Sequence, residues 1–283
     1  MPSRNHLSAC LCFKDAASYL AEWLAFYATL GVGHFYLYDN ESVDDVDAVV
    51  APYVSAGRVT LIAAPGRAVQ YDAYAHCLAT FGSRTRWLMF CDDDEFLFPV
   101  RDISLPAALE PYERQAGVAV AWMLYGSSGH WQRPRGWVIE NYAMRAAVPD
   151  HHVKCIVDPS RVRRPLLIGH QFECVAGEHI VDECGEPMTG PLHPNPTAAV
   201  FRINHYLTKS RVELTARRQR IQANTGEVSS LSLPQWIELE ANWNQVRDPV
   251  AARYGDRMRT HASAMAGRAA ADSTAAGRGL RLR

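Results

Sequence analysis

The chain has 283 residues, of which 48% are apolar and 21% are charged, and its formal net charge is -1. This composition is typical of a folded globular protein, and the balanced charge excludes the strong basic field of a general nucleic-acid-binding protein. The sequence contains no uninterrupted run of about 18 apolar residues, so it predicts no helix that spans a bilayer.

The amino-terminal residues and the cysteines predict a cytoplasmic protein. Residues 1–6 lead into a strand-like run and lack the apolar core of a signal peptide. The seven cysteines are scattered and form no Cys-x-x-Cys pair, which argues against a zinc site. Several lie in apolar runs, so we expect buried, reduced thiols. Peripheral attachment to the inner face of a membrane is compatible with this location.

The first part of the chain alternates between apolar strands and amphipathic helices. Strand-like runs lie at Leu7–Phe13, His34–Tyr38 and Val59–Ile62, and a further one begins at Trp87. One helix between them carries Leu20, Trp23, Leu24 and Tyr27 on a single apolar face, and others are predicted at about residues 42–56 and at Gln70–Phe81. This alternation predicts an α/β fold with a parallel sheet covered by helices.

Four consecutive carboxylates, Asp92-Asp93-Asp94-Glu95, follow the strand that begins at Trp87. Ligands of open α/β sheets bind just beyond the carboxyl ends of the strands, and adjacent acids repel one another unless a cation neutralises them. Because residues i and i+2 of an extended segment share a face, Asp92 and Asp94 are predicted to ligate one hard divalent cation. The alternative is a solvated acidic turn. Glu95 is expected either to support these ligands or to pair with a buried arginine.

The alternation weakens after Pro99. A helix is predicted at Ser104–Gln115 and a strand at Val118–Leu124, followed by irregular strands and loops over Gly136–Pro196. The pattern then predicts a strand at Val200–Ile203, a basic helix at Thr208–Gln222 and a helix at Pro234–Val246. The segment from about Ala262 has little apolar bulk, so we expect a disordered tail.

Several further residues are candidates for ligand binding. His205 stands at the end of a late strand, where its imidazole is placed to complete the coordination of an ion. Lys209, in the first turn of the basic helix, suits phosphate oxygens, whereas Arg217 fits a solvated basic face. Asp39 ends the second strand, where it would bind a base or ribose or cap the next helix. Aromatic residues at Trp122 and in the loop 125–131 suit stacking on a sugar or a place in the core.

Six ordered blocks give the chain a resemblance to glycosyltransferase family 92, which is related to the large family 2 of sugar-nucleotide glycosyltransferases. The match spans roughly residues 8–255. The blocks are Glu22-Trp23 through Leu30-Gly31-Val32, His34–Asn40, Ala73–Leu78, Trp87–Phe96, Gly126–His130, and Arg202–Tyr206 leading to Lys209-Ser210.

The resemblance implies a GT-A fold, which is a Rossmann-like domain with a mostly parallel central sheet flanked by helices and followed by C-terminal helices. It implies one domain over residues 1–260, with a nucleotide-sugar half at about 7–100, an acceptor half at about 101–207 and helices at about 208–260, before the tail at 261–283. It also implies Mn²⁺ or Mg²⁺ at Asp92 and Asp94, with His205 near the diphosphate. The family carries Lys-Asn-Glu after its first strand, whereas this chain has Lys14-Asp15-Ala16; Lys14 matches and is a donor-binding candidate, and Asp15 is the alternative to the acid that Ala16 replaces.

The reaction implied by the resemblance is transfer of a sugar from a UDP-sugar to a hydroxyl of a glycan or another acceptor, with inversion. The donor-binding candidates are Lys14, Asp39, Asp92 and Lys209. An inverting enzyme needs a carboxylate base opposite the leaving group. Candidates in the acceptor half are Glu140, Glu173, Asp182 and Glu183, of which Glu173 and Glu183 are preferred.

Two rival functions remain at the level of the sequence. A metal-dependent sugar nucleotidyltransferase would need a Gly- and Arg-rich segment after the first strand, and Cys10–Asp15 supplies none. A catalytically inactive nucleotide-sugar-binding protein on the same fold is disfavoured by the acid pair and His205, and favoured by Ala16, which stands where the family has an acid.

Overall fold

Strands and helices alternate through the first part of the chain. The computed structural model describes residues 5–218, 227 and 231–278. The first elements are β1 (Asn5–Phe13), α1 (Ala17–Thr29), β2 (His34–Asp39), α2 (Val46–Ser55), β3 (Val59–Ala63), α3 (Gln70–Phe81) and β4 (Thr85–Phe90). β1 pairs in parallel with both β2 and β4, and β2 pairs in parallel with β3. These strands and helices overlap those that the apolar pattern predicts.

The second part of the chain is richer in short strands. Its elements are β5 (Glu95–Pro99), α4 (Leu105–Leu109), β6 (Gly117–Leu124), α5 (Val138–Asn141), β7 (Met144–Arg145), β8 (Asp150–Val157), β9 (Val162–Leu167), β10 (Gln171–Cys174), β11 (Ile180–Val181), β12 (Phe201–His205), α6 (Arg211–Arg218), α7 (Leu233–Ala241), β13 (Val246–Arg247) and α8 (Gly255–Arg278). Short 3-10 helices lie at Gly82–Arg84, Glu110–Tyr112 and Val250–Tyr254.

One mixed sheet joins the two parts, with the order β3-β2-β1-β4-β8-β6-β12-β5 and with β11 beside β6. β8 runs antiparallel to both of its neighbours, β4 and β6. β12 is parallel to β6 and antiparallel to the edge strand β5. The structure therefore confirms an α/β fold with a mixed, mostly parallel central sheet flanked by helices.

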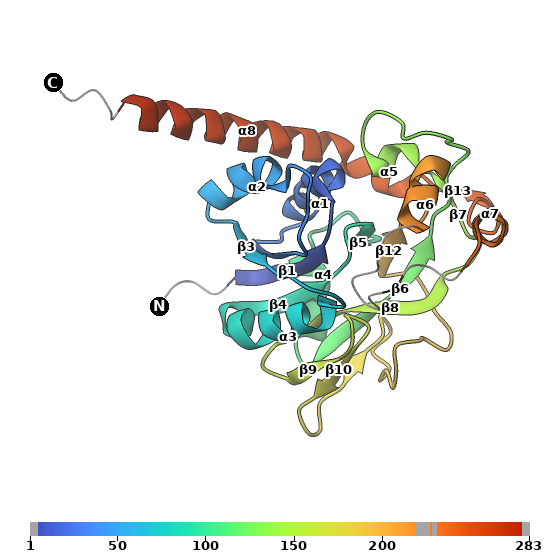
Figure 1. Ribbon diagram of the computed structural model, residues 1–283. Coiled ribbons are helices and arrows are strands. Elements are labelled where there is room, and N and C mark those ends of the chain that lie inside the picture. Colours follow the sequence, from blue (N-terminus) through green and yellow to red (C-terminus); the bar gives the residue numbers. More distant parts are fainter. Residues whose placement is uncertain (1–4, 219–226, 228–230, 279–283) are drawn as a thin grey trace.

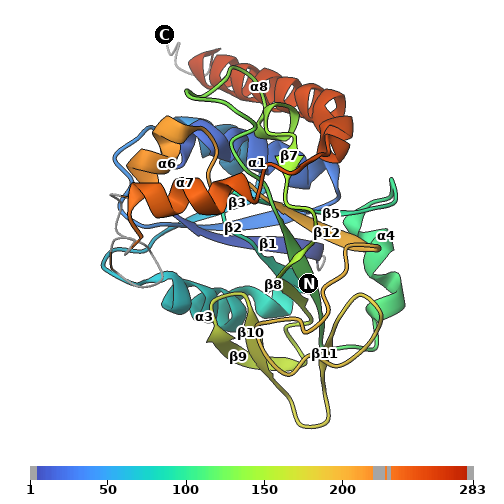
Figure 2. The same ribbon diagram turned by 90° about the vertical axis from the view of Figure 1, so that its right-hand side faces the viewer.

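The sheet is buried on both faces. Helices α1, α2 and α8 cover one face, and α3 with the β9–β10 hairpin covers the other (Figures 1 and 2). In β1, Leu7, Ala9 and Leu11 belong to the apolar cluster on the first face, whereas Cys10 and Cys12 belong to the cluster on the second. Burial on both faces explains why β1 is an unbroken apolar run in the sequence.

Four expectations about the second part need correction. The segment Gly136–Pro196 is not wholly irregular, because it contains β8, a strand in the middle of the sheet. The predicted helix Ser104–Gln115 is only α4 and a 3-10 turn, since Pro111 lacks the N–H that an α-helix needs. The predicted helix Pro234–Val246 ends at Ala241, and Val246 pairs with β7. The basic helix begins at Arg211 rather than Thr208, and its predicted end at Gln222 lies outside the described residues.

The tail differs most from its prediction. Where we expected disorder over residues 261–283, helix α8 continues to Arg278, and residues 279–283 lie outside the described part. Met258 and Met265 are buried against the main apolar cluster. The segment is rich in alanine, which has the highest helix propensity, so its low bulk reflects helix-forming residues. Within the described ranges, the helices include none with the length and hydropathy of a bilayer span.

Candidate active site

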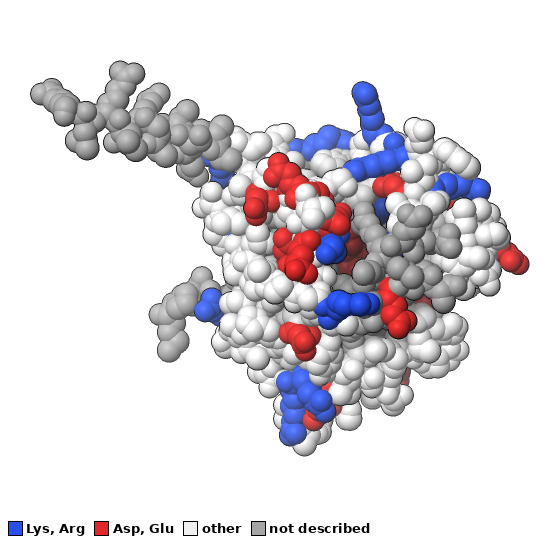
Figure 3. Space-filling view, in the orientation of Figure 1, with Lys and Arg blue, Asp and Glu red and all other residues white. Residues whose placement is uncertain are grey.

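A cavity of about 800 Å³ lies at the carboxyl ends of the central strands. Residues that follow β1, β2 and β3 form one side of it, the acid cluster after β4 lies in the middle, and residues of β6, β12 and the β9–β10 turn form the other side. Helices α6 and α7 contribute Arg217 and Trp236 to the wall. On the face shown in Figure 3, acidic side chains gather beside basic ones instead of forming a field of one sign. The cavity thus has the position that ligands occupy in open α/β sheets.

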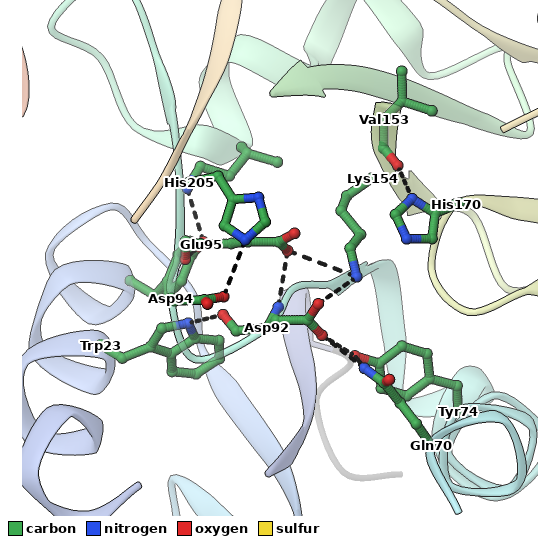
Figure 4. A network of polar contacts seen from close by, with 12 residues as sticks. Trp23, Gln70, Tyr74, Asp92, Asp94, Glu95, Val153, Lys154, His170 and His205 are labelled. Carbon is green, nitrogen blue, oxygen red and sulfur yellow. Dashed lines mark hydrogen bonds and ion pairs between the residues drawn. The ribbon is translucent and has the colours of Figure 1, made fainter. Parts of the chain in front are cut away.

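The carboxylate of Asp92 is held by protein groups on both oxygens (Figure 4). Its Oδ2 lies 2.9 Å from Lys154 Nζ, and its Oδ1 accepts hydrogen bonds from Gln70 Nε2 (2.7 Å) and the Tyr74 hydroxyl (3.2 Å). Burial opposes ionisation of Asp92, but Lys154 outweighs it and holds the pKa of this carboxyl below its usual value. The ionised form is therefore preorganised as a partner of Lys154.

Glu95 supports this arrangement from inside the sheet. Its Oε2 accepts a hydrogen bond from the backbone N–H of Asp92 (2.9 Å) and lies 3.8 Å from Lys154 Nζ. Burial raises the pKa of Glu95 above its usual range. The buried cation expected beside Glu95 is thus a lysine of β8 and not an arginine.

Asp94 is aimed at a different set of groups. The antiparallel pairing of β5 and β12 sets His205 opposite Glu95, and His205 Nε2 lies 3.4 Å from Asp94 Oδ1. The other oxygen, Oδ2, is ion-paired with Arg217 of α6. Burial opposes the charge on Asp94, but Arg217 and His205 hold its pKa well below the usual value. The Arg217 side chain is 44% exposed, in line with the predicted solvated face, but its ion pair with Asp94 was not predicted.

Two side chains of the site, those of Asp94 and His205, bear on its fit to a divalent cation. Within the described residues, no group of three or more His, Cys, Asp and Glu side chains is arranged to hold a metal ion. Asp94 Oδ1 is nevertheless buried without a hydrogen-bond partner among these residues, and His205 Nε2 lies beside it. An oxygen and an imidazole nitrogen suit an ion that takes its remaining ligands from a substrate and water. The pair Asp94–His205 fits such an ion, whereas Asp92, also predicted as a ligand, is turned toward Lys154.

Cationic side chains line the same cavity as the acid cluster. Lys14 and Lys209, both predicted to bind the donor, line the cavity with Arg67 and Arg217. Lys209 has a φ of 50°, a left-handed conformation that costs a non-glycine residue about 1 kcal/mol or more. Its Nζ lies 3.7 Å from the centre of the Tyr19 ring. Burial lowers the pKa of Lys209, while the nearby carboxylates of the cluster oppose that shift.

Asp39 fills neither of its two predicted roles, because the N-cap of α2 is Asp45 and Asp39 instead holds the turn after β2. Its Oδ1 accepts a hydrogen bond from the backbone N–H of Ser42 (3.0 Å), and its side chain is not among the described groups that line the cavity. The next residue, Asn40, does line the cavity, and its Nδ2 donates to the carbonyls of Ala64 (2.7 Å) and Gly66 (3.0 Å). The carboxyl end of β2 therefore contributes to the site through Asn40.

The two preferred catalytic bases do not reach the cavity. Glu183 accepts hydrogen bonds from Thr197 and from three successive backbone N–H groups of residues 199–201, so both of its oxygens anchor the start of β12. Glu173 of β10 pairs with Arg163 and Arg164 at the surface and lines a separate cavity of about 280 Å³. We therefore drop both residues as bases.

The other two acids in the acceptor half are engaged elsewhere as well. Glu140 pairs with Arg259 of α8, and Asp182 accepts a hydrogen bond from His193 (3.0 Å). Neither belongs to the described lining of the larger cavity. The partners of Glu140 and Asp182 thus lie outside this cavity, and neither acid is placed to act as a base there.

Trp122 and the loop 125–131, the aromatic residues predicted to contact a sugar, lie in different places. Trp122 lines the cavity, but the described lining includes no residue of the loop 125–131. The backbone N–H groups of Ser127 and Ser128 bond to Glu240 and Asn244, which ties this loop to α7. Trp131 is 67% exposed. Of these aromatic residues, Trp122 is the one in the described lining of the cavity, and its stacking on a sugar stays a prediction.

Sequence reasoning missed Lys154 and His170. Lys154 interrupts the apolar run Val153–Val157. A lysine in a buried strand requires an anionic partner, so its presence in this run could have indicated a contact with the acid cluster. His170 lies in the turn between β9 and β10 and lines the cavity. The apolar pattern carries no signal for His170.

Comparison with known proteins gives one family. Residues 6–167 match the model of glycosyltransferase family 92. A family 92 protein of Ricinus communis is 30% identical over 216 residues, which cover 72% of this chain and 35% of that protein. A galactan beta-1,4-galactosyltransferase of Arabidopsis thaliana is 29% identical over 161 residues, 50% of this chain and 32% of that protein. The chain spans about a third of the length of the curated relatives it matches.

Among solved structures, the crystal structure of S. aureus TarS 1-349 in complex with UDP-GlcNAc is similar with a TM-score of 0.35 and 11% identity. The similar region covers 49% of this chain and 39% of that one.

Proposed function

The chain belongs to glycosyltransferase family 92, and from this premise we propose that it transfers a hexosyl group from a UDP-sugar to a hydroxyl of a glycan acceptor, with inversion. One observation supports the proposal above all. Asp94 and His205 lie in the same cavity as Lys209 and Arg217, so groups suited to an ion and groups suited to phosphate oxygens share one site.

The leaving diphosphate explains why the cavity holds both signs of charge. As the acceptor oxygen bonds to the anomeric carbon, the bond from that carbon to the diphosphate breaks and negative charge grows on the diphosphate. Lys209 and Arg217 are placed to stabilise that charge, because cations fixed where charge develops lower the barrier. Asp94 and His205 would hold Mn²⁺ or Mg²⁺, which adds charge neutralisation at the diphosphate when bound.

The two sides of the cavity suggest where each substrate lies. The ends of β1, β2 and β3 contribute Lys14, Asn40 and Gly66 to one side, which we assign to the nucleotide. Trp122 and His170 lie on the opposite side of the acid cluster, which we assign to the acceptor. Asp92, fixed by Lys154, lies between the two sides. All seven cysteines are free thiols, in keeping with the cytoplasmic location that we propose.

The test is a donor and acceptor panel. The protein is incubated with UDP-sugars, beginning with UDP-galactose because two relatives are galactan beta-1,4-galactosyltransferases, together with Mn²⁺ and β-1,4-galactan oligosaccharides. UDP release and an extended oligosaccharide with inverted anomeric configuration, read by NMR, are expected. UDP binding without transfer from any donor would contradict the proposal and favour the catalytically inactive scaffold.

A further inference from the structure

The acids that line the cavity leave the acceptor side without a free carboxylate base. Asp92 and Asp94 are ion-paired with Lys154 and Arg217. Asp15 and Glu41 lie at the nucleotide side and accept backbone hydrogen bonds there, from Val43 and Gly66. Glu213 accepts hydrogen bonds from Ser210 and Tyr142. Asp93 is the one remaining acid in the described lining; burial raises its pKa, which the charge of Lys209 opposes, and it belongs to the acid cluster and not to the acceptor side.

His170 has the geometry that these acids lack. Its Nδ1 lies 2.6 Å from the carbonyl oxygen of Val153, and a carbonyl only accepts, so the ring proton is on Nδ1. That assignment leaves the lone pair on Nε2. Because the ring lines the cavity on the acceptor side, it offers a proton acceptor there. Burial lowers the pKa of His170 to about 4, with Lys154 adding to the effect, so the ring is neutral at physiological pH. It is then a weaker base than free imidazole, and its contribution depends on its fixed position beside the acceptor.

The turn that carries His170 packs against Lys154 and Tyr74, two of the residues that hold Asp92. Gly169 has a φ of 66°, and a Cβ there would lie 3.2 Å from Lys154 Cδ and 3.4 Å from a ring carbon of Tyr74. The Gly169 carbonyl accepts a hydrogen bond from the backbone N–H of Cys155 (2.9 Å). Lys154 and Tyr74 are the residues that hold Asp92, so His170 and the acid cluster are fixed relative to each other.

Trp122 supplies a surface for a sugar beside this imidazole. Its ring centre lies 5.3 Å from that of His170 and 4.4 Å from that of His205. Its indole N–H is buried without a hydrogen-bond partner among the described residues. Indole rings present an apolar face with a polar edge, which suits a sugar ring with its hydroxyls.

We propose that His170 is the general base, with Nε2 accepting the proton of the attacking acceptor hydroxyl; this inference rests on the proposed function. The acceptor oxygen forms its bond to the anomeric carbon, and the bond from that carbon to the diphosphate breaks with its electron pair leaving on UDP. The hydroxyl proton passes to His170 Nε2. The imidazolium then releases it to water, which the neighbouring Lys154 favours by charge repulsion.

The experiment measures single-turnover transfer by His170→Ala with the donor and acceptor pair identified by the panel. The transfer rate is expected to fall about 100-fold or more, the usual contribution of a general base, while calorimetry finds UDP affinity within about twofold of wild type. Added imidazole should restore part of the rate, and more basic imidazole derivatives should restore more. A purely structural role for His170 would produce no such dependence on basicity.

Two further variants sharpen the test. His152, 50% exposed at its side chain, stacks on the same Trp122 but is absent from the described lining of the cavity, so His152→Ala is expected to keep its transfer rate. Asp93→Asn removes the charge of the remaining acid in the lining, and so tests whether that carboxylate is the base in place of His170. A rate in His170→Ala near wild type, or a loss that no imidazole restores, overturns the inference. If the wild-type protein transfers no sugar at all, the proposed function fails, and the inference fails with it.

Discussion

Lys154 Nζ lies 2.9 Å from Asp92 Oδ2, so a lysine from the antiparallel strand β8 neutralises the first carboxylate of the acid cluster that follows β4. The Lys154 side chain is 1% exposed, and that of its second neighbour, Glu95, is fully buried. The two halves of the sheet are thus linked by charge as well as by backbone hydrogen bonds at the place where the cavity opens.

Replacing Lys154 with methionine is expected to lower the free energy of unfolding by about 3 kcal/mol, because it leaves carboxylates in a buried site without their cation. Urea denaturation at pH 7 measures the change. The control is Arg163→Met, which removes an ion pair whose arginine is 59% exposed and should cost less than about 1 kcal/mol. Equal effects of the two substitutions would show that the Lys154–Asp92 pair has no special role in stability.

Asp94→Asn keeps the size of the side chain and removes its charge. We expect turnover to fall about 100-fold or more, since the leaving charge is then poorly neutralised, and wild-type activity to vanish in a chelator and return with Mn²⁺ or Mg²⁺. His205→Ala should cost less, because water can take its place at an ion. Calorimetry of Mn²⁺ binding in the presence of UDP gives a readout independent of turnover. Wild-type turnover of Asp94→Asn at saturating donor would refute the metal assignment.

Lys209→Ala separates recognition of the diphosphate from recognition of the nucleoside. The substitution should weaken UDP binding by about 1.5–3 kcal/mol, the value of a hydrogen bond to a charged group, and leave the affinity for uridine unchanged. The matched control is Arg211→Ala, whose guanidinium pairs with Glu240 at 3.6 Å and does not belong to the described lining. Parallel losses for UDP and uridine would mean that Lys209 supports the fold of the site and does not bind the diphosphate.

Glu22 gives the protein a pH-dependent stability. Burial raises the pKa of Glu22 to about 7 from its ordinary value of 4.5, against the backbone N–H groups of Val138 and Ile139. The folded state thus binds this proton more tightly, so the stabilisation is complete below about pH 4.5 and is lost as pH rises through about 7. The loss is on the order of 3 kcal/mol.

Urea denaturation of wild type and Glu22→Gln at pH 5 and pH 8 isolates this contribution. Glutamine does not ionise in this range, so the wild-type protein should lose stability relative to the variant as pH rises. Identical pH slopes in the two proteins would rule out Glu22 as the source.

The strands that begin the sheet were predictable because their burial is simple. In β1, alternate side chains belong to two separate apolar clusters, one on each face of the sheet. The strand therefore appears in the sequence as an uninterrupted apolar run, which indicates burial on both faces. The acid cluster was also predictable, since carboxylates directly after such a run must lie at the carboxyl edge of the sheet. Asp94 and His205 meet there as expected.

β8 was not predictable from its own residues. His151 and His152 are exposed and Lys154 is buried, so the strand has neither a continuous apolar run nor a clean alternation. The buried position of Lys154 in this strand depends on its partner Asp92, which lies 62 residues earlier in the chain. The bases preferred from the sequence failed for a related reason: the spacing of Glu183 gives no sign that its lone pairs are taken by the backbone of residues 199–201.

The position of β8 also sets the order in which the protein can be completed during synthesis. β4 leaves the ribosome well before Asp150–Val157, and at about 5–20 residues per second its outer edge stays unpaired for several seconds. An unpaired apolar strand edge is a template for association with other chains. Nascent chains and truncated fragments that end before Asp150 are therefore expected to need a chaperone to stay soluble, and a stalled ribosome would expose that edge for as long as it pauses.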